Sequence, residues 1–355
     1  MRRATITGWG KCVPPAVLSN ADLETVMDTT DEWISSRSGI KERRVSHVET
    51  SDMATVAAEH AIAAAGLSKD DIDLLIVCTC SPDRLLPSSA AIVQRKLGTV
   101  NAATMDLNAA CTGFIYGIAM ANGMIAAGTS KRALVIGAEK LSAYLNLEVR
   151  STGVLFGDGA GAVVLEAAEG DEGILALDVG SDGRLSEILT LTHSGTEYVE
   201  EYLFDEQTIV MEGREVFRNA VVQMGDSAAK VVAAAGLELD DVDILIPHQA
   251  NERIIDATAK RMKLRPDQVY VNIASYGNTS AATIPIALTE ALSEGRIRPG
   301  AVLVFVAFGG GLTWGGAALR WGSRTAPVET SDVSLPPTDK TGLELLAARP
   351  RRAHP

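Results

Sequence analysis

The segment Gly66-Leu-Ser-Lys-Asp-Asp-Ile-Asp-Leu-Leu-Ile76 returns later in the chain as Gly236-Leu-Glu-Leu-Asp-Asp-Val-Asp-Ile-Leu-Ile246. Each copy follows an alanine-rich amphipathic stretch, residues 53–65 and about 216–235, and each ends in an apolar run typical of a buried strand. The long distance between the copies indicates gene duplication rather than a solenoid. Because apolar runs alternate with helical stretches in both halves, the sequence predicts two α/β units with largely buried sheets.

Further segments of the two halves match each other at the same separation in sequence as Gly66 and Gly236. This separation sets Ala133-Leu-Val-Ile136 against Leu303-Val-Phe-Val306, and Cys111 against Ala281, just after Asn278. If the duplicated halves face each other, residues near Cys111 and near Asn278 meet at the interface between them. Such interfaces are common places for functional sites.

We divide the chain at the boundaries of this repeat. The first half covers residues 1–170, the second half covers residues 171–322, and a tail covers residues 323–355. The tail is rich in proline, serine, threonine and charged residues, a composition typical of segments that do not fold. We therefore expect it to be disordered.

Composition excludes several classes of protein. The chain has 355 residues, 46% of them hydrophobic, which is ample for a large core. A net charge of −13 and the lack of aromatic residues among the basic ones argue against nucleic-acid binding. The sequence shows no signal peptide and no apolar stretch of membrane-spanning length. Its four cysteines form neither Cys-x-x-Cys nor a paired metal spacing, so we expect a protein of the reducing cytoplasm.

Cys111 is the candidate nucleophile. It lies in Asn108-Ala-Ala-Cys-Thr-Gly-Phe114, where an apolar run ends and a helical stretch begins. A helix N-terminus carries unpaired N–H groups and partial positive charge, which favour a thiolate and leave a donor for an oxyanion. Free cysteines are more often small buried hydrophobes, so this interpretation depends on partners elsewhere in the chain.

Two candidate partners follow β-like runs in the second half. His248 comes directly after an apolar strand and a proline, where open α/β sheets build their sites, although a lone histidine is more often structural. Asn278 lies in a Gly-Asn-Thr-Ser string, which is also ordinary turn chemistry. Together with Cys111 they supply a thiolate and two neutral hydrogen-bond donors.

Seven short strings in a fixed order carry a resemblance to a known family. They are Thr29-Thr-Asp-Glu-Trp-Ile-Ser-Ser-Arg-Ser-Gly-Ile40, the Cys111 segment, Phe156-Gly-Asp-Gly-Ala-Gly161, Met211-Glu-Gly213, His248-Gln-Ala-Asn251, Gly277-Asn-Thr-Ser280 and Ala307-Phe-Gly-Gly-Gly-Leu-Thr-Trp314. From Gly8 to about Trp321 the chain resembles β-ketoacyl-acyl-carrier-protein synthase III, the initiating condensing enzyme of fatty-acid synthesis, of the thiolase-fold superfamily. The resemblance implies a five-layered αβαβα architecture, a Cys-His-Asn triad and a homodimer.

The resemblance also implies a mechanism. An acyl group passes from acyl-CoA to Cys111, with the N–H groups of Cys111 and Gly310 as the oxyanion hole. Malonyl-acyl-carrier-protein then loses carbon dioxide, while His248 Nε2 and the Asn278 amide donate to the enolate oxygen. The carbanion attacks the acyl-Cys111 thioester, giving a 3-oxoacyl-carrier protein without metal or redox cofactor.

Residues for substrate delivery follow from the same resemblance. Trp33 and Arg37 share one face of a helix opened by Thr30 or Asp31, and the matching pair of the family sandwiches the CoA adenine. Without that resemblance they could be an exposed cation–π pair with no ligand. Further CoA contacts are assigned to Arg150 and Asn251.

Positive charge is concentrated between Arg253 and Arg265 in an otherwise acidic chain. An acidic protein needs such a patch to bind another acidic protein. The positions that match carrier-protein contacts of the family are Arg218, Arg253, Lys260 and Arg261. The alternative is a solvated helix face, which explains most charge runs.

Leu86 stands where many relatives carry a phenylalanine that reaches across the dimer to close the acyl pocket. A flexible leucine leaves more room, so we expect branched or medium-length starters as well as acetyl. The rest of the pocket wall is expected near residues 191–204.

Other condensing enzymes fit less well. Degradative thiolases need a second cysteine near the glycine loop, which Phe308-Gly-Gly-Gly-Leu-Thr-Trp314 lacks. Plant-type polyketide synthases lack the Asp-Glu-Trp and Gly-Asn-Thr-Ser strings, and hydroxymethylglutaryl-CoA synthases need a glutamate base. A synthase III paralogue of a natural-product pathway, loading an unusual starter or acylating a small acceptor, stays open. So does a catalytically silent binding module.

Overall fold

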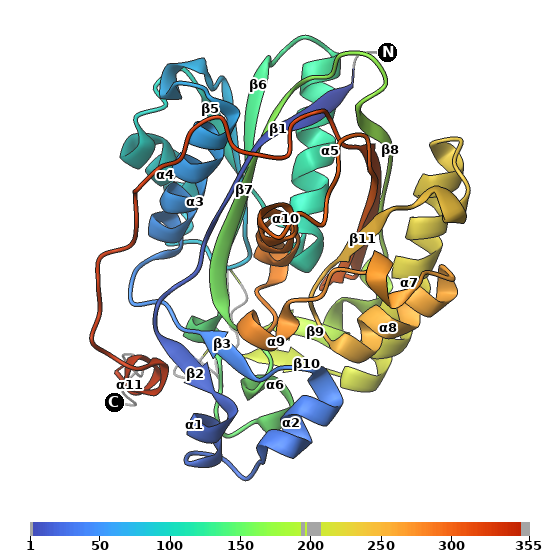
Figure 1. Cartoon of the computed structure of the whole chain (residues 1–355). Helices are drawn as coiled ribbons and strands as arrows, with labels where there is room; N and C mark the ends of the chain where they lie inside the picture. The colour runs from blue at the N-terminus through green and yellow to red at the C-terminus, as the bar shows by residue number, and fades with distance from the viewer. Residues whose placement is uncertain (1–2, 193–195, 197–206, 349–355) are drawn as a thin grey trace.

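The computed structural model describes residues 3–192, 196 and 207–348. Figure 1 shows two main sheets with helices outside and between them. The strands of the first sheet, in spatial order, are β1 (Ala4–Cys12), β7 (Asp158–Ala167), β6 (Arg132–Lys140), β4 (Leu74–Cys78) and β5 (Ala103–Leu107). Those of the second are β11 (Ile244–Pro247), β12 (Val302–Gly309), β13 (Thr313–Arg320) and β8 (Gly173–Ser181). Two small pairs join β2 (Val17–Ser19) to β3 (Glu42–Arg44) and β9 (Leu189–Leu191) to β10 (Ile209–Met211).

The sequence repeat is also a structural repeat. In the first sheet β4 runs parallel to β6 with Leu74 opposite Ala133, and in the second β11 runs parallel to β12 with Ile244 opposite Leu303. The offset found in the sequence relates one pair to the other. The counterpart of β5 is reduced to an isolated bridge between Leu245 and Val269, which leaves the second sheet one strand smaller.

Helices complete five layers. The outer face of the first sheet packs on α3 (Thr50–Ala65) and α4 (Ser89–Leu97), and that of the second on α7 (Gly213–Ala234) and α8 (Glu252–Arg261). Between the sheets lie α5 (Gly113–Ala126) and α10 (Thr283–Ser293). The remaining helices are α1 (Asn20–Glu24), α2 (Asp31–Ser38), α6 (Arg150–Gly153), α9 (Ile273–Tyr276) and α11 (Gly342–Ala347). The αβαβα architecture expected from the resemblance is confirmed.

Alternating side chains explain why each sheet is covered on both faces. Leu74, Ile76 and Cys78 of β4 point into the central layer, whereas Leu75 and Val77 point toward α3 and α4. All five are fully buried. A strand that is apolar on both faces is stable only between two layers of helices, which is the arrangement found here.

The expectation of a disordered tail is wrong for residues 323–348, and residues 349–355 lie outside the described part of the chain. The tail runs along the outside of the first half (Figure 1), where Val328 N donates to the Ala64 carbonyl oxygen at 3.0 Å. His60 Nε2 lies 2.9 Å from the Val333 carbonyl oxygen. Composition misled the prediction because a few apolar side chains and backbone bonds to a folded surface are enough to order a polar segment.

Candidate active site

Cys111 lies at the junction of the strand β5 and the helix α5, in a 3-10 turn formed by Ala110–Thr112. Ala110 has a φ of 47°, and Ser280 has a φ of 49° at the equivalent point of the second half. Both turns therefore place a residue with left-handed backbone conformation just before a helix of the central layer, α5 or α10, and the two turns pack against each other. The predicted position of Cys111 at the start of a helix is confirmed.

Burial controls the ionisation of this thiol. Burial raises the pKa of Cys111 to about 12, although a hydrogen bond with Ser280 and the backbone N–H of Cys111 act in the opposite direction. The expectation that the helix start favours the thiolate does not hold, because loss of solvation outweighs the helix-terminal donors. Cys111 therefore rests as a thiol.

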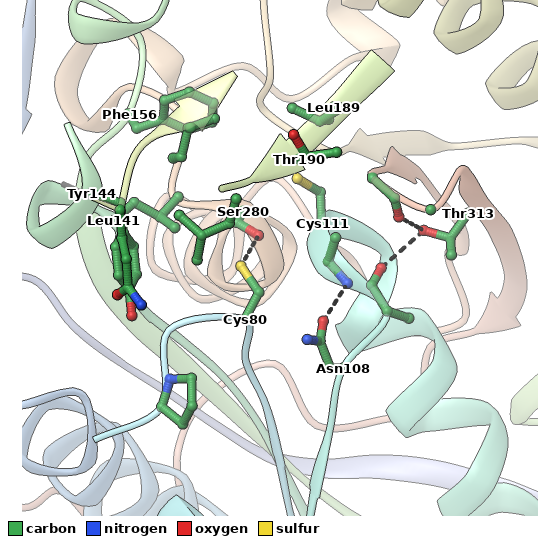
Figure 2. A pocket seen from close by; sticks show the side chains of 18 of the residues that line it. Cys80, Asn108, Cys111, Leu141, Tyr144, Phe156, Leu189, Thr190, Ser280 and Thr313 are labelled. Atoms are coloured by element: carbon green, nitrogen blue, oxygen red, sulfur yellow. Dashed lines mark hydrogen bonds between the residues drawn. The ribbon is translucent and has the colours of Figure 1, made fainter. Parts of the chain in front are cut away.

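Ser280 connects the two halves at the nucleophile. Its Oγ donates to Glu139 Oε1 at 3.0 Å and lies 4.0 Å from Cys80 Sγ (Figure 2). Glu139 is fully buried at the end of β6 and also accepts from the backbone N–H of Cys80 at 3.1 Å and of Ser81 at 3.1 Å. Burial raises the pKa of Glu139 in spite of these donors. The sequence interpretation missed both Ser280 and Glu139.

His248 follows β11 and is buried, with 1% of its surface exposed. Burial lowers its pKa to about 3, so the imidazole is neutral. Its Nδ1 lies 2.7 Å from Thr283 Oγ1, which lies 3.0 Å from the Ser280 carbonyl oxygen. The single hydroxyl proton of Thr283 can serve only one of these two acceptors, and this choice decides which ring nitrogen of His248 carries a proton.

Asn278 is held by three hydrogen bonds. Its backbone N–H donates to the Leu155 carbonyl oxygen at 2.9 Å, and its own carbonyl oxygen accepts from the Gly157 N–H at 3.0 Å. The side-chain Oδ1 accepts from Ser280 N at 2.8 Å. This last bond fixes the orientation of the amide, because an acceptor must face the Ser280 N–H and the NH₂ group then faces the opposite way. Asn278 is therefore positioned as a donor.

The glycine loop after β12 closes on Cys111. A Cβ at Gly309 would lie only 2.7 Å from Cys111 N, so a larger residue there would displace the nucleophile. Thr313 Oγ1 contacts the carbonyl oxygens of Ala109 at 2.9 Å and Gly310 at 3.2 Å. This one hydroxyl, whose surroundings Figure 2 shows, ties the loop to the segment that precedes Cys111. Thr313 belonged to a motif of the sequence but had no role assigned.

A cavity of about 810 Å³ opens at Cys111. Figure 2 shows Phe156, Leu141 and Tyr144 on one side of it and Leu189 and Thr190 on the other. Its wall includes Ser280 and Gly310, but His248 and Asn278 are not among the lining residues. Cys111 therefore belongs to the wall of this cavity, whereas His248 and Asn278 are connected to another wall residue, Ser280, by the hydrogen bonds of Thr283 and of the Ser280 N–H.

Leu86, the predicted gate of the acyl pocket, does not line the cavity of its own chain. Leu85 lines the cavity, whereas Leu86 does not and is 87% exposed. Leu191 forms part of the cavity wall, as expected for the region near residues 191–204, and Gln207, just beyond that region, also lines the cavity. Within that region, residues 193–195 and 197–204 lie outside the described part of the chain.

The four residues assigned to CoA form one cluster at the surface. The guanidinium carbons of Arg37 and Arg150 lie 4.6 Å and 4.3 Å from the ring centroid of Trp33. Asn251 Nδ2 donates to the Arg37 carbonyl oxygen at 2.9 Å, and Arg150 donates to the Asp28 carbonyl oxygen at 2.7 Å. Thr30 caps the helix α2 that carries Trp33 and Arg37, as predicted. The structure brings all four together.

The four basic residues assigned to a carrier protein lie on the neighbouring helices α7 and α8. The Arg253 guanidinium carbon lies 5.8 Å from the Phe217 ring, next to Arg218 in the chain, whereas Arg261 pairs with Asp226. Arg253 and Arg261 are eight residues apart on α8, about 12 Å along its axis. The set therefore forms an elongated band, and Lys260 is exposed within it.

Two further findings concern metals and membranes. No group of three or more His, Cys, Asp or Glu side chains that could hold a metal ion occurs among the described residues. None of the helices in that part of the chain has both the length and the apolar character needed to cross a bilayer.

Sequence and structure comparisons agree with this architecture. The family "3-Oxoacyl-[acyl-carrier-protein (ACP)] synthase III" matches residues 105–183, and "3-Oxoacyl-[acyl-carrier-protein (ACP)] synthase III C terminal" matches residues 232–321. The Beta-ketoacyl-[acyl-carrier-protein] synthase III 2 of Vibrio cholerae is 52% identical over 346 residues, which cover 97% of this chain and 95% of that protein. The Beta-ketoacyl-[acyl-carrier-protein] synthase III of Geobacillus kaustophilus is 49% identical over 321 residues, covering 90% of this chain and 99% of that protein.

The crystal structure of 3-oxoacyl-[acyl-carrier-protein] synthase III from Aquifex aeolicus matches with a TM-score of 0.85 and 44% identity. The match covers 90% of this chain and 100% of that one. Because these relatives match across both halves, each with close to half of its residues identical, the chain belongs to the β-ketoacyl-acyl-carrier-protein synthase III family, the condensing acyltransferases that initiate fatty-acid synthesis.

Proposed function

We propose that this enzyme transfers an acyl group from acyl-CoA to Cys111 and condenses it with malonyl-acyl-carrier-protein. The products are 3-oxoacyl-acyl-carrier-protein, CoA and carbon dioxide. The observation that carries the proposal is the position of Cys111 at the end of an apolar cavity, next to Ser280 of the turn that holds Asn278 and Thr283. Through Thr283 this turn also reaches His248.

The first step is acyl transfer to the thiol. Cys111 attacks the thioester carbon, the bond from that carbon to the CoA sulfur breaks, and the thiol proton leaves on CoA. No net charge is created, which suits a buried thiol whose pKa is about 12. In the tetrahedral intermediate the oxygen carries negative charge, and the backbone N–H groups of Cys111 and Gly310 are proposed to stabilise it. Thr313 supports this arrangement by holding the loop of Gly310 in place.

The second step is decarboxylation of the malonyl group. As carbon dioxide leaves, its bonding electrons form an enolate, and negative charge develops on the thioester oxygen. The Asn278 NH₂ group and His248 Nε2–H are proposed to donate to that oxygen. For His248 this requires the Thr283 hydroxyl to donate to Nδ1, so that the only ring proton is on Nε2. Neither donor is charged, so neither readily transfers a proton that would quench the enolate.

The third step joins the two substrates. The enolate carbon attacks the acyl carbon of acyl-Cys111, a carbon–carbon bond forms and the carbon–sulfur bond to Cys111 breaks. The released thiolate must take up a proton to return to its resting form. The N–H groups of Cys111 and Gly310 are proposed to stabilise the oxyanion in this step as well as in the first step, because the reacting carbonyl belongs to the same acyl group.

Substrate binding is proposed at the two surface clusters. The Trp33, Arg37, Arg150 and Asn251 cluster would hold the adenine nucleotide of CoA, since a flat indole between guanidinium groups suits a base. The band of Arg218, Arg253, Lys260 and Arg261 would bind the acidic carrier protein. Within this band Arg261 is paired with Asp226 and Arg218 lies 3.5 Å from Glu215, so we expect these two arginines to contribute less than Lys260 does.

A homodimer is part of the proposal. The strand β5 is an edge of the first sheet in this chain, and exposed edges invite pairing with a second copy. Large apolar side chains are exposed nearby in sequence, with Val100 74%, Leu85 81% and Leu86 87% accessible. Burial of these side chains by a partner would remove apolar surface from water and carry Leu86 toward the partner's pocket. A reducing cytoplasm fits the four free thiols, and no cofactor is proposed.

The starter group is proposed to extend beyond acetyl. A cavity of about 810 Å³ with Leu141, Phe156 and Leu189 in its wall has room for a branched or medium-length acyl chain. Leu86 would close the pocket of a partner less tightly than an aromatic ring. A strict preference for acetyl-CoA across a panel of acyl donors would contradict this part of the proposal.

One experiment tests the whole function. The purified protein is incubated with a panel of acyl-CoAs, with and without malonyl-acyl-carrier-protein, and analysed by intact-mass spectrometry and product analysis. Acylation at Cys111 followed by formation of 3-oxoacyl-carrier protein supports the proposal, and the most efficient donor identifies the starter. Acylation without condensation would instead indicate transfer to a small acceptor, and absence of acylation would indicate a binding module.

A further inference from the structure

The C-terminal extension is the tail of residues 323–355, and its described part, residues 323–348, reaches the cluster on which the candidate nucleotide site is built. Its last helix, α11, begins with a capping box in which Thr341 and Glu344 bond each other's backbone N–H groups. Gly342 packs so closely on β2 that a Cβ there would lie 2.7 Å from the Val17 carbonyl oxygen and 2.9 Å from Leu18 Cβ. Figure 1 shows α11 beside β2, although β2 lies near the start of the chain and α11 near its end. The extension is therefore docked at a defined position.

The helices α11 and α2 both contribute side chains to one apolar cluster. Leu346 is 4% exposed and belongs to one cluster with Leu18, Leu23 and Ile34, and Leu343 and Leu345 pack against that cluster. Ile34 is a fully buried residue of α2, and Trp33, the preceding residue, packs on the same cluster. The helix α2 is thus packed against a cluster that α11 helps to form. Beside this contact, Trp33 lies next to the guanidinium groups of Arg37 and Arg150.

Short helices depend on such contacts. The helix α2 has eight residues, fewer than an isolated helix needs to be stable in water, so its position is set by what it packs against. A change in the packing of Leu346 would alter the cluster that positions Ile34 and, through it, the orientation of Trp33. The chemistry at Cys111 draws on a different set of contacts and would not be affected.

The comparisons show that the extension is not shared by all relatives. Residues 1–322 amount to roughly nine-tenths of the chain, so the 97% match to the Vibrio cholerae protein includes part of the extension. The match to the Aquifex aeolicus structure covers that chain completely but only 90% of this chain. The unmatched part of this chain is therefore about as long as the extension. The core fold therefore forms without an extension in some relatives, and its presence here needs a different explanation.

We propose that the C-terminal extension is a positioning segment for the nucleotide half of the CoA thioester. Through Leu346 and Gly342 it fixes the packing of α2, and α2 in turn holds Trp33 and Arg37 in the geometry that stacks on an adenine. The inference rests on the proposed function of the Trp33 cluster and deepens it. It assigns this segment to binding of the first substrate and not to the acyl or malonyl chemistry.

The test compares two acyl donors in the full-length protein. One donor is acyl-CoA, and the other is the corresponding acyl-pantetheine, which has the same reacting thioester but lacks the nucleotide. The variants are Leu346→Ala, which removes apolar contacts from the cluster, and Gly342→Val, whose side chain would clash with β2 and displace α11. The matched control is Leu335→Ala in the same extension, because Leu335 packs on the α3 cluster and not on the cluster of Trp33.

For both variants the KM of Cys111 acylation by acyl-CoA should rise about 3- to 10-fold, with kcat and the kinetics of acyl-pantetheine unchanged. Leu335→Ala should leave both donors unaffected. Equal losses for the two donors would show a merely structural role and overturn the proposal, as would an unchanged KM for acyl-CoA in both variants. If the unaltered enzyme is acylated by neither donor, the proposed function has failed and this inference falls with it.

Discussion

The hydroxyl of Thr283 should decide how well the enzyme decarboxylates malonyl groups. Thr283 is buried, with 3% of its surface exposed, and its Oγ1 lies 2.7 Å from His248 Nδ1. Valine has nearly the same shape as threonine but cannot donate. In Thr283→Val, Nδ1 would lose this hydroxyl whichever ring nitrogen carries the proton, so the preference for the Nε2–H form would be lost and the form that has its proton on Nδ1 would become populated. That form cannot donate to the enolate oxygen.

The size of the effect follows from the lost hydrogen bond. An intramolecular hydrogen bond contributes about 0.5–1.5 kcal/mol, and an unsatisfied buried acceptor costs about 1–3 kcal/mol. Because roughly 1.4 kcal/mol corresponds to a factor of ten, we expect decarboxylation to slow about 10-fold. Acylation of Cys111 should not change, since this step uses backbone donors. Thr283→Ser keeps the hydroxyl and should behave like the parent enzyme.

The assay follows release of carbon dioxide from malonyl-acyl-carrier-protein, with acylation of Cys111 measured separately by intact mass. Nitrogen chemical shifts of labelled histidine report which ring nitrogen carries the proton. Decarboxylation that is unchanged or faster in Thr283→Val would refute the reasoning. It would mean that the Thr283 hydroxyl bonds the Ser280 carbonyl oxygen, that His248 carries its proton on Nδ1, and that Nε2 acts as an acceptor.

The other predictions concern the triad, the basic band and pH. Cys111→Ala should abolish covalent acylation in the intact-mass assay. Asn278→Ala should still be acylated but should lose about 10²- to 10³-fold in decarboxylation, as expected for loss of an oxyanion donor, and retained condensation would contradict that role. Lys260→Glu should raise the KM for malonyl-acyl-carrier-protein more than Arg261→Glu does, because Arg261 is already paired with Asp226; equal effects in steady-state kinetics would count against this. Burial lowers the pKa of His248 to about 3, so decarboxylation rates measured between pH 5 and 8 should show no step from its titration, whereas a step near pH 6.5 would show that the ring is solvated.

The same depressed pKa has a consequence for stability. In the unfolded chain His248 is protonated below about pH 6.5, whereas in the folded protein it stays neutral down to about pH 3. The unfolded state therefore binds more protons in that interval, and the contribution of His248 to the free energy of unfolding decreases as the pH falls from about 6.5 toward 3.

Much of the architecture could be predicted because it rests on local and repeated patterns. Strands that are apolar on both faces, such as β4, require helices on both sides, and the repeat offset predicted that β4–β6 and β11–β12 would be built alike. Thr30 was identified as a possible cap of α2 because a side-chain cap involves only residues close in sequence. The positions of Cys111 and His248 at the ends of strands were predictable for the same reason, whereas Asn278 follows the short helix α9 and not the strand that the sequence suggested.

Residues that act through distant contacts were not predictable in this way. Glu139 continues an apolar run of β6, and only the tertiary structure surrounds its carboxylate with donors from Cys80, Ser81 and Ser280. Thr283 reads as an ordinary helix residue until His248 is brought to 2.7 Å from it. The ionisation of Cys111 was mispredicted because the cost of burial depends on everything that excludes water from the thiol, whereas the helix-terminal effect can be inferred from the neighbouring residues alone.

The sequence by itself determined the two duplicated α/β units, which depend on periodicity, and the family, which depends on short strings. The αβαβα architecture and the candidate triad followed from the resemblance to that family. Only the tertiary structure decided how the tail and the site are arranged. The polar composition of the tail suggested disorder, yet Leu335 and Leu346 find apolar surfaces that were formed by residues far earlier in the chain. Whether a segment is ordered depends on the free energy of such contacts, and the surface that offers them exists only once the rest of the chain has folded.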